Sequence, residues 1–130
     1  MTVEIKKYNA ASDYKNLIDL IEFEGEEWED YIKKNRTKYQ RSLAESITYV
    51  AYCDGVLCGY SRSINDSHLY IWIVDLLVHK KYRGNNIGKK LIECVATDFP
   101  RLKIFVLSDV DAYYKKLGYV KEGSIFKIDI

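Results

Sequence analysis

One segment constrains this chain more than any other, because an apolar run ends in a basic, glycine-containing loop and is followed by an amphipathic pattern. The apolar run IWIVDLLV occupies residues 71–78, and the loop HKKYRGNNIGKK follows at residues 79–90. Apolar residues then recur at helical spacing until Pro100, at Ile87, Leu91, Ile92, Val95 and Phe99. The pattern predicts a strand over residues 69–78, a loop, and a helix from about residue 86 to residue 99.

The loop has the features of an anion-binding site. Gly84 and Gly88 permit backbone angles that other residues avoid, and Asn85 and Asn86 tolerate the left-handed region better than most. Backbone N–H groups can therefore converge at a helix N-terminus, where the helix dipole is positive. Basic side chains surround the loop: Lys80, Lys81, Arg83, Lys89 and Lys90. A nucleotide P-loop is longer and carries Ser or Thr, and no GxGxxG follows any strand, so ATP and dinucleotides are poor candidates.

The loop lies within the segment VDLLVHKKYRGNNIGKKLIECV, which resembles the acyl-CoA pyrophosphate segment of the GNAT N-acetyltransferase superfamily. The family pattern is Arg or Gln, x, x, Gly, x, Gly or Ala. Arg83 and Gly88 match its ends, and the internal glycine falls on Asn86.

A second segment, DAYYKKLGYV at residues 111–120, is similar to the family's late helix-to-strand motif. In that motif a tyrosine lies four residues before a glycine that is followed by an aromatic residue. Tyr114, Gly118 and Tyr119 fit it. The two segments stand in the family's order along the chain.

The resemblance implies transfer of an acetyl group from acetyl-CoA to a primary amine of a small molecule or peptide by direct attack. It implies no metal and no covalent enzyme intermediate. The strand backbone at Leu76, Leu77 and Val78 would hold the pantetheine arm and donate to the oxyanion. The family's pyrophosphate contacts fall here on Arg83, Gly84, Asn85, Asn86, Ile87, Gly88 and Lys89.

Two side chains are catalytic candidates. Tyr114 would lie beside the CoA sulfur and protonate the thiolate, because a phenol's ordinary pKa is above a thiol's. The alternative is a packing tyrosine, since the chain has twelve, and Tyr113 is the local competitor. Asp75 is the only charge within residues 71–78, and a carboxylate in an apolar strand is costly to bury unless it is paired or functional. We predict that it accepts the amine proton; the alternative is an Asp that bonds to neighbouring backbone or lies at a bulge.

The remaining pattern predicts an α/β fold in which helices cover both faces of a mixed sheet of six to seven strands, the family's architecture. An Asp54-Gly55 turn joins two of the strands. Ser108 and Asp111 resemble a capping box, and Gly118 ends the helix that they open. The expected strands are residues 3–8, 47–54, 56–63, 69–78, 103–107, 119–121 and 124–130. The expected helices before the loop are residues 12–21 and 26–45, the second with a polar middle at 33–38 that can break it.

Length and charge limit the other possibilities. A chain of 130 residues fits one domain, residues 1–130, and a net charge of +1 argues against a general binder of nucleic acid or membrane surfaces. The start of the chain lacks a signal core, and no apolar run approaches the roughly 20 residues that span a bilayer, so we expect a soluble, cytoplasmic protein. Cys53, Cys58 and Cys94 lack metal or disulfide spacing.

The acceptor and the assembly are less constrained. An acidic cluster would attract a cationic amine such as a polyamine, an aminoglycoside or a lysine side chain, although acidic residues also favour a solvated helix N-terminus. Its members are Glu22, Glu24, Glu26, Glu27, Glu29 and Asp30. The terminal segment SIFKIDI predicts an edge strand that can pair in a homodimer. The alternative to an enzyme is a noncatalytic acyl-CoA-binding or sensing domain.

Overall fold

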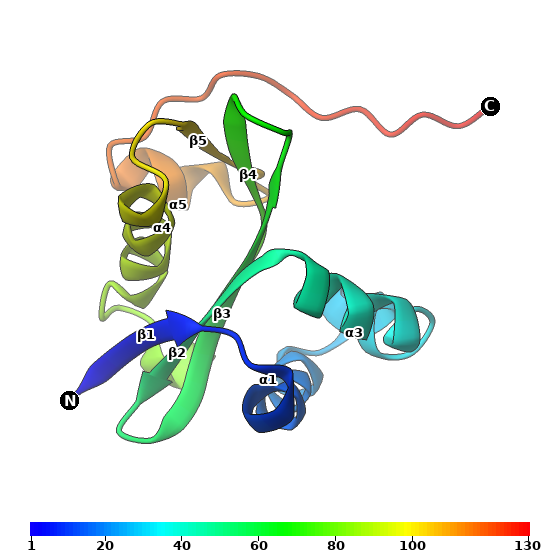
Figure 1. Ribbon diagram of the computed structural model, residues 1–130, viewed down its shortest axis with the longest axis vertical. Helices are drawn as coiled ribbons and strands as arrows, with labels where there is room; N and C mark the ends of the chain where they lie inside the picture. The colour runs from blue at the N-terminus through cyan, green and yellow to red at the C-terminus, as the bar shows by residue number, and fades with distance from the viewer.

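The computed structural model describes residues 1–130, and a single mixed sheet forms its centre (Figure 1). The strands lie in the order β1-β2-β3-β4-β5. The first four pair antiparallel, and β4 pairs parallel with β5. Their bounds are β1 Val3–Lys7, β2 Ile47–Cys53, β3 Val56–Asn65, β4 Tyr70–Val78 and β5 Lys103–Val106. The predicted mixed α/β fold is confirmed.

Helices cover both faces of the sheet and enclose two hydrophobic clusters. Leu17, Ile21 and Leu43 belong to the helices before β2 and pack against one face of the sheet. Leu91 and Val95 belong to the helix after β4 and pack against the opposite face. The predicted helix over residues 26–45 is interrupted at residues 33–35, within its polar middle. The helices are α1 Ala10–Glu24, η1 Glu26–Trp28, α2 Glu29–Ile32, α3 Arg36–Glu45, η2 Lys80–Tyr82, α4 Ile87–Asp98 and α5 Asp111–Lys116.

Strand β4 contains a bulge that reverses its inner and outer faces. Ser63 of β3 pairs with Ile73 and Arg62 pairs with Asp75, so Val74 is an extra residue in β4. Ile73 packs in the cluster beneath α4, whereas Leu77 packs in the cluster beneath α1 and α3. In a regular strand, residues two apart share a face. The bulge therefore turns Asp75 toward the helices that precede β2.

The same point marks where β4 and β5 separate. Their ladder covers only Tyr70–Ile73 of β4, and the backbone N–H of Leu107 makes the next bond, to the Ile73 carbonyl at 2.9 Å. After this bond the chain turns away toward α5. Residues 74–78 keep β3 as their strand neighbour on one side and have an open edge on the other.

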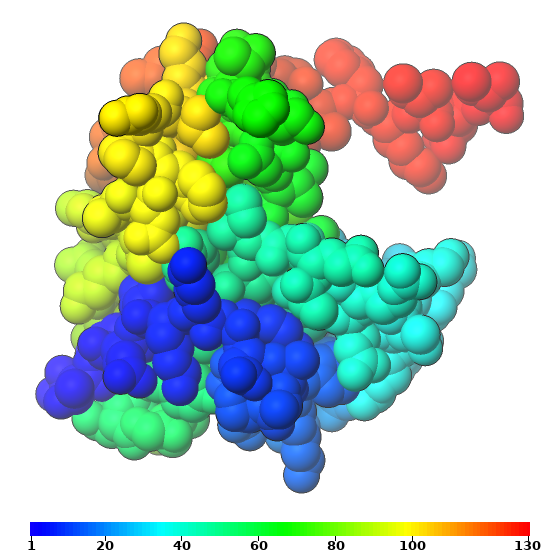
Figure 2. Space-filling view, in the orientation of Figure 1, coloured from blue at the N-terminus to red at the C-terminus, as the bar shows by residue number.

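The C-terminal hairpin predicted at residues 119–121 and 124–130 is not formed, so the sheet has five strands rather than six or seven. Tyr119 packs against the cluster beneath α4, whereas residues 120–130 are exposed and lead into an extended arm that projects from the body (Figures 1 and 2). Phe126 and Ile128 are 84% and 80% exposed. An alternating segment becomes a strand only when its backbone groups meet a partner edge, and this arm leads away from β5.

The start of α5 also differs from the predicted capping box. Val110 occupies the cap position, and the Ser108 hydroxyl donates to the Asp111 carboxylate at 2.9 Å instead of capping the helix. Gly118 ends the helix as predicted. Its φ of 88° is in the left-handed region, which glycine adopts without steric cost.

Candidate active site

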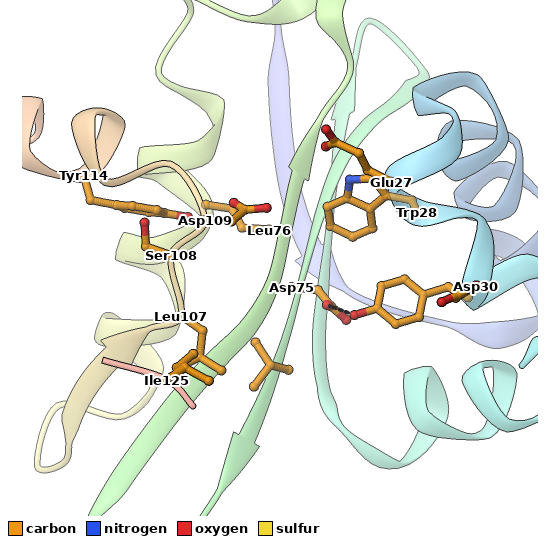
Figure 3. A pocket seen from close by; sticks show the side chains of 12 residues that line it. Glu27, Trp28, Asp30, Asp75, Leu76, Leu107, Ser108, Asp109, Tyr114 and Ile125 are labelled. Carbon is orange, nitrogen blue, oxygen red and sulfur yellow. Dashed lines mark hydrogen bonds between the residues drawn. The ribbon is translucent and has the colours of Figure 1, made fainter. Parts of the chain in front are cut away.

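A cleft of about 380 Å³ opens where β4 and β5 separate (Figure 3). One wall comes from the η1 and α2 helices, the floor from the bulged part of β4, and the other wall from the chain after β5. Ile125 of the C-terminal arm lies at this second wall. The lining residues are Glu27, Trp28, Asp30, Tyr31, Val74, Asp75, Leu76, Leu107, Ser108, Asp109, Tyr114 and Ile125.

The charges that line the cleft are all negative. Glu27, Asp30, Asp75 and Asp109 contribute carboxylates, and no lysine or arginine is among the lining residues. Arg62 balances Asp75 from behind, with its Nε 2.6 Å from Asp75 Oδ2. Three carboxylates without such a partner therefore face the cleft, and a cleft of one sign concentrates ligands of the opposite sign.

The acidic cluster of the sequence is divided by the fold. Glu27 and Asp30 line the cleft, whereas Glu24 pairs with Arg83 and Glu29 pairs with Lys33. The other two members, Glu22 and Glu26, lie exposed outside the lining.

Tyr114 reaches the cleft from α5, and in Figure 3 its ring points toward β4. Burial raises the pKa of Tyr114 to about 12, with further contributions from Tyr113 and Asp109. The phenol is therefore protonated at neutral pH and can donate a proton. Tyr113 packs edge-on against Tyr114, with 5.0 Å between ring centroids, and is not among the lining residues. Of the two tyrosines, only Tyr114 lies at the cleft.

Asp75 lies in the floor of the cleft and is held from three sides. Tyr31 donates to Oδ1 at 2.9 Å, and Tyr39 and Arg62 Nε each bond to Oδ2 at 2.6 Å. Tyr39 also shares a hydrogen bond of 2.7 Å with Tyr60. The Asp75 side chain is only 2% exposed. Its role as the base stays a prediction, and its contacts are those of a paired buried carboxylate at a bulge.

The predicted pantetheine strand follows directly after Asp75. Leu76 lines the cleft, Leu77 is buried in the cluster beneath α1 and α3, and Val78 is half-buried. On β3, Ser61 pairs with Leu76, Tyr60 with Leu77 and Gly59 with Val78. Their other edge is open, which is the arrangement that a strand-like ligand requires.

The predicted phosphate loop leads from β4 to the N-terminus of α4. Asn86, which replaces the family's internal glycine, is the N-cap residue and has a left-handed backbone with φ of 60°. Gly84 has φ of 87°. Asn85 is tied to the preceding turn through a 3.0 Å bond from its side-chain amide to the Tyr82 carbonyl. Gly84 and Asn86 thus have the positive φ angles that the sequence predicts for this loop, whereas Asn85 and Gly88 do not.

The first residues of α4 combine burial with close packing. Ile87 and Gly88 are buried and Lys89 is exposed. A side chain at Gly88 would collide with the hydroxyl of Tyr113, so glycine at this position allows α5 to approach the start of α4. Tyr113 therefore has a packing role beside the loop.

Arg83 makes contacts that the sequence did not indicate. Its guanidinium binds both carboxylate oxygens of Glu24, at 2.9 and 3.1 Å, and its Nε donates to the Val78 carbonyl at 2.9 Å. Next to Glu24, Phe23 stacks on His79 with 4.2 Å between ring centroids. Two contacts therefore join the end of α1 to the chain that enters the loop.

Tyr31, Tyr39 and Arg62 were not predicted to be the partners of Asp75. Arg62 carried a usable signal, because it is the only charged residue inside the apolar strand β3. The tyrosines carried none, since nothing in their spacing predicts that α2 and α3 would bring them to one carboxylate on β4.

No helix combines the length and apolar character that crossing a bilayer requires. No three side chains of the types His, Cys, Asp or Glu gather in a way that could hold a metal ion.

Comparison with known proteins agrees with this geometry. An acetyltransferase (GNAT) domain model matches residues 44–121, which include the bulge, the loop and Tyr114. An uncharacterized N-acetyltransferase ycf52 of Pyropia yezoensis is 28% identical over 71 residues, which are 51% of this chain and 41% of the relative. The chain thus matches less than half the length of that relative.

Solved structures share the fold. PaiA N-acetyltransferase from Thermoplasma acidophilum, solved in complex with coenzyme A, superposes with a TM-score of 0.79 at 18% identity over 96% of this chain and 94% of that one. An aminoglycoside acetyltransferase from an uncultured soil metagenomic sample superposes with a TM-score of 0.73 at 22% identity over 100% and 99%. Since the GNAT model covers more than half of the chain, the protein belongs to the GNAT acetyltransferase family.

Proposed function

We propose that residues 1–130 form one N-acetyltransferase domain that uses acetyl-CoA and acts on a positively charged primary amine of a small molecule or peptide. The observation that carries the proposal is the open edge of β4 at residues 74–78. The chain continues from this edge through the loop to the N-terminus of α4, and Leu76 of the edge lines the acidic cleft together with Tyr114.

The residues present fit acetyl-CoA. Exposed backbone at Gly84, Asn85 and Asn86 leads into the positive end of α4, a twelve-residue helix, which suits a pyrophosphate. No strand pairs with the outer edge of residues 76–78, and this edge suits the amide-bearing pantetheine arm, although the Val78 carbonyl already accepts from Arg83 Nε. When bound, acetyl-CoA supplies the thioester that carries the acetyl group.

The side chains would then divide the chemistry. Backbone N–H groups at the open edge are candidates for the donor that stabilises the oxyanion. As the amine nitrogen bonds to the acetyl carbon and the carbon–sulfur bond breaks, Tyr114 would give its proton to the sulfur. Its pKa, raised to about 12 by burial, keeps the phenol protonated at physiological pH, and the position of Tyr114 at the cleft is what supports the role.

The cleft supports the choice of a cationic acceptor. Glu27, Asp30 and Asp109 face the same space from two walls and have no lining cation to balance them. An ammonium group is attracted to such a cleft, whereas an anionic acceptor is repelled. The amine must lose a proton before it attacks. The sequence predicts that Asp75 accepts this proton.

Calorimetric titration with acetyl-CoA, with CoA and ATP as comparators, tests the cofactor assignment. We expect binding of acetyl-CoA and CoA at about micromolar Kd and no comparable binding of ATP. Thiol release in the presence of polyamines, aminoglycosides and lysine-containing peptides then tests catalysis. A folded protein that does not bind acetyl-CoA would contradict the proposal.

A noncatalytic acyl-CoA-binding domain is the second candidate. The contacts of Asp75 favour this candidate, because Tyr31, Tyr39 and Arg62 already form hydrogen bonds to the carboxylate that is predicted as the base. Binding of acetyl-CoA without thiol release from any of the amines would support this candidate over the enzyme.

A further inference from the structure

Tyr31 offers a polar group to the cleft that the proposed chemistry has not used. Its half-buried side chain lines the cleft from α2. The ring stacks on Tyr39 at 4.2 Å with 14° between planes, and Trp28 packs edge-on at 5.7 Å. Packing on these two rings restricts the phenol to one orientation, so its hydroxyl has a defined place in the cleft wall.

The direction of the Tyr31 proton follows from its partner. A carboxylate has only acceptor atoms, so the 2.9 Å bond between Tyr31 and Asp75 Oδ1 requires that the phenol donates. Figure 3 shows this bond at Asp75. Burial and the nearby Asp75 charge raise the pKa of Tyr31 to about 12. The proton therefore stays on the phenol and points to Asp75 at any pH near neutrality.

A phenol whose only proton is committed can interact with a ligand only as an acceptor, through its remaining lone pairs. A carboxylate that accepts a hydrogen bond from the phenol also polarises it, and this makes the phenol oxygen a stronger hydrogen-bond acceptor. An amine or ammonium group, which offers N–H donors, suits this oxygen. A ligand that presents only acceptor atoms does not.

Asp75 is poorly placed to meet the amine itself. Its Oδ2 accepts from Tyr39 and Arg62 at 2.6 Å each, and Oδ1 accepts from Tyr31. The bond from Arg62 is also an ion pair with this carboxylate. With a side chain only 2% exposed, the carboxylate offers little surface to the cleft that it lines, and of its three partners only Tyr31 also lines the cleft.

We propose that Tyr31 binds and orients the acceptor amine through its phenol oxygen, and that Asp75 is a positioning residue that holds the Tyr31 proton away from the cleft. This inference rests on the proposed function and names the amine-binding group of the same site. It assigns Asp75 a different task from the proton acceptor predicted from the sequence.

The test uses Tyr31→Phe, which removes the hydroxyl and keeps the stacked ring. With the best acceptor found among spermidine, kanamycin and a lysine peptide, we expect the amine KM to rise at least about tenfold, the size of one hydrogen bond to a charged group. The Kd of acetyl-CoA and the kcat should stay near the wild-type values. Tyr39→Phe is the matched control, because it removes another bond to Asp75 from a residue that is 4% exposed and does not line the cleft.

Asp75→Asn separates positioning from proton transfer. If Asp75 positions Tyr31, the amine KM rises as in Tyr31→Phe and the pH dependence of kcat keeps its shape. A collapse of kcat with an unchanged amine KM, and loss of a limb of the pH profile, would overturn the inference and support Asp75 as the base.

The remaining outcomes distinguish the inference from the proposed function. If wild type and Tyr31→Phe acetylate the amine with the same KM, the inference is wrong and the acetyltransferase assignment stands. If acetyl-CoA does not bind, or no amine in the set is acetylated, the proposed function is contradicted and the inference falls with it.

Discussion

The two halves of β4 share one strand but differ in their neighbours. Residues 71–73 pair with both β3 and β5, and Ile71 and Ile73 fill the core beneath α4. Residues 75–78 pair with β3 alone, and Asp75 turns to the opposite face. The extra residue Val74 lies at the boundary. One inserted residue thus coincides with both an open strand edge and a carboxylate beside it, so the first half of β4 is structural and the second half is the candidate site.

Tyr114→Phe should give the largest effect, because it removes the hydroxyl that we propose as the proton donor at the cleft. We expect kcat to fall by about 10² to 10⁴-fold, the usual contribution of a positioned acid. Steady-state thiol release measures the loss, and calorimetry should show an unchanged Kd for acetyl-CoA. Because the pKa of Tyr114 is raised to about 12, a basic limb caused by this group should begin only above the ordinary phenol pKa.

Tyr113→Phe is the control for this variant, since Tyr113 is the neighbour outside the cleft. Equal losses of kcat in both variants would show that the tyrosines act through packing and would remove the acid role from Tyr114.

Ile73→Ala tests the structural half of β4. Ile73 is fully buried, and removal of its side chain should cost about 2–5 kcal/mol of unfolding free energy. Urea denaturation measures this loss, and Ile71→Val in the same half should cost only about 0.5–1.5 kcal/mol. The folded fraction should keep the wild-type Kd for acetyl-CoA. A large change in that Kd would show that the two halves are not separable.

Asn86→Ala concerns the loop that continues from the open half. Asn86 has φ of 60°, where alanine is strained and asparagine is tolerated, so we expect a loss of about 1 kcal/mol in stability. Asn86→Gly should stay within about 0.5 kcal/mol of wild type, because glycine adopts this angle but gains entropy when unfolded. Thermal unfolding of the three proteins measures the differences, and equal midpoints for the alanine variant and wild type would argue against the left-handed backbone.

Glu24→Gln releases Arg83 at the start of that loop. The Arg83 side chain is 48% exposed and that of Glu24 is 13% exposed, so loss of this partly exposed pair should cost about 1 kcal/mol of unfolding free energy. The Kd for acetyl-CoA should decrease by about two- to fivefold at low salt, because an unpaired cation near the loop attracts the anionic pyrophosphate. Glu45→Gln, which breaks the exposed pair with Arg41 on α3, is the control and should leave the Kd unchanged.

Removal of residues 124–130 should have the smallest effect on stability. The arm is exposed along its length, so the unfolding free energy should change by less than about 0.5 kcal/mol. Light scattering of the full chain tests the homodimer predicted from this segment, because that dimer requires the arm as a pairing strand. A monomeric mass for the full chain would contradict the dimer.

The elements that could be predicted are those whose signals are local. The strand–loop–helix unit from β4 to α4, the Asp54-Gly55 hairpin and the glycine that ends α5 depend on residues within a few positions of one another. The C-terminal hairpin was predicted from the same kind of local alternation, but strand formation also needs a free partner edge, and the arm does not meet one.

The bulge at Val74 shows why the site itself was harder to predict. Nothing in IWIVDLLV marks one residue as extra, since the insertion is defined only by the register against β3. Without the bulge, Asp75 would share a face with Ile73 and lie beneath α4. The sequence therefore marks Asp75 as an unusual charge in an apolar strand, but it does not predict which side chains bond to it.

By itself, the sequence determined the mixed α/β class, the basic loop at a helix N-terminus and the family resemblance, because these depend on periodicity and on residue types close together in the chain. Only the tertiary structure decided which tyrosine reaches the cleft, that Tyr31, Tyr39 and Arg62 converge on Asp75, and that Glu24 holds Arg83. These contacts join residues 13 to 59 positions apart, and their geometry exists only after strand register and helix packing are set.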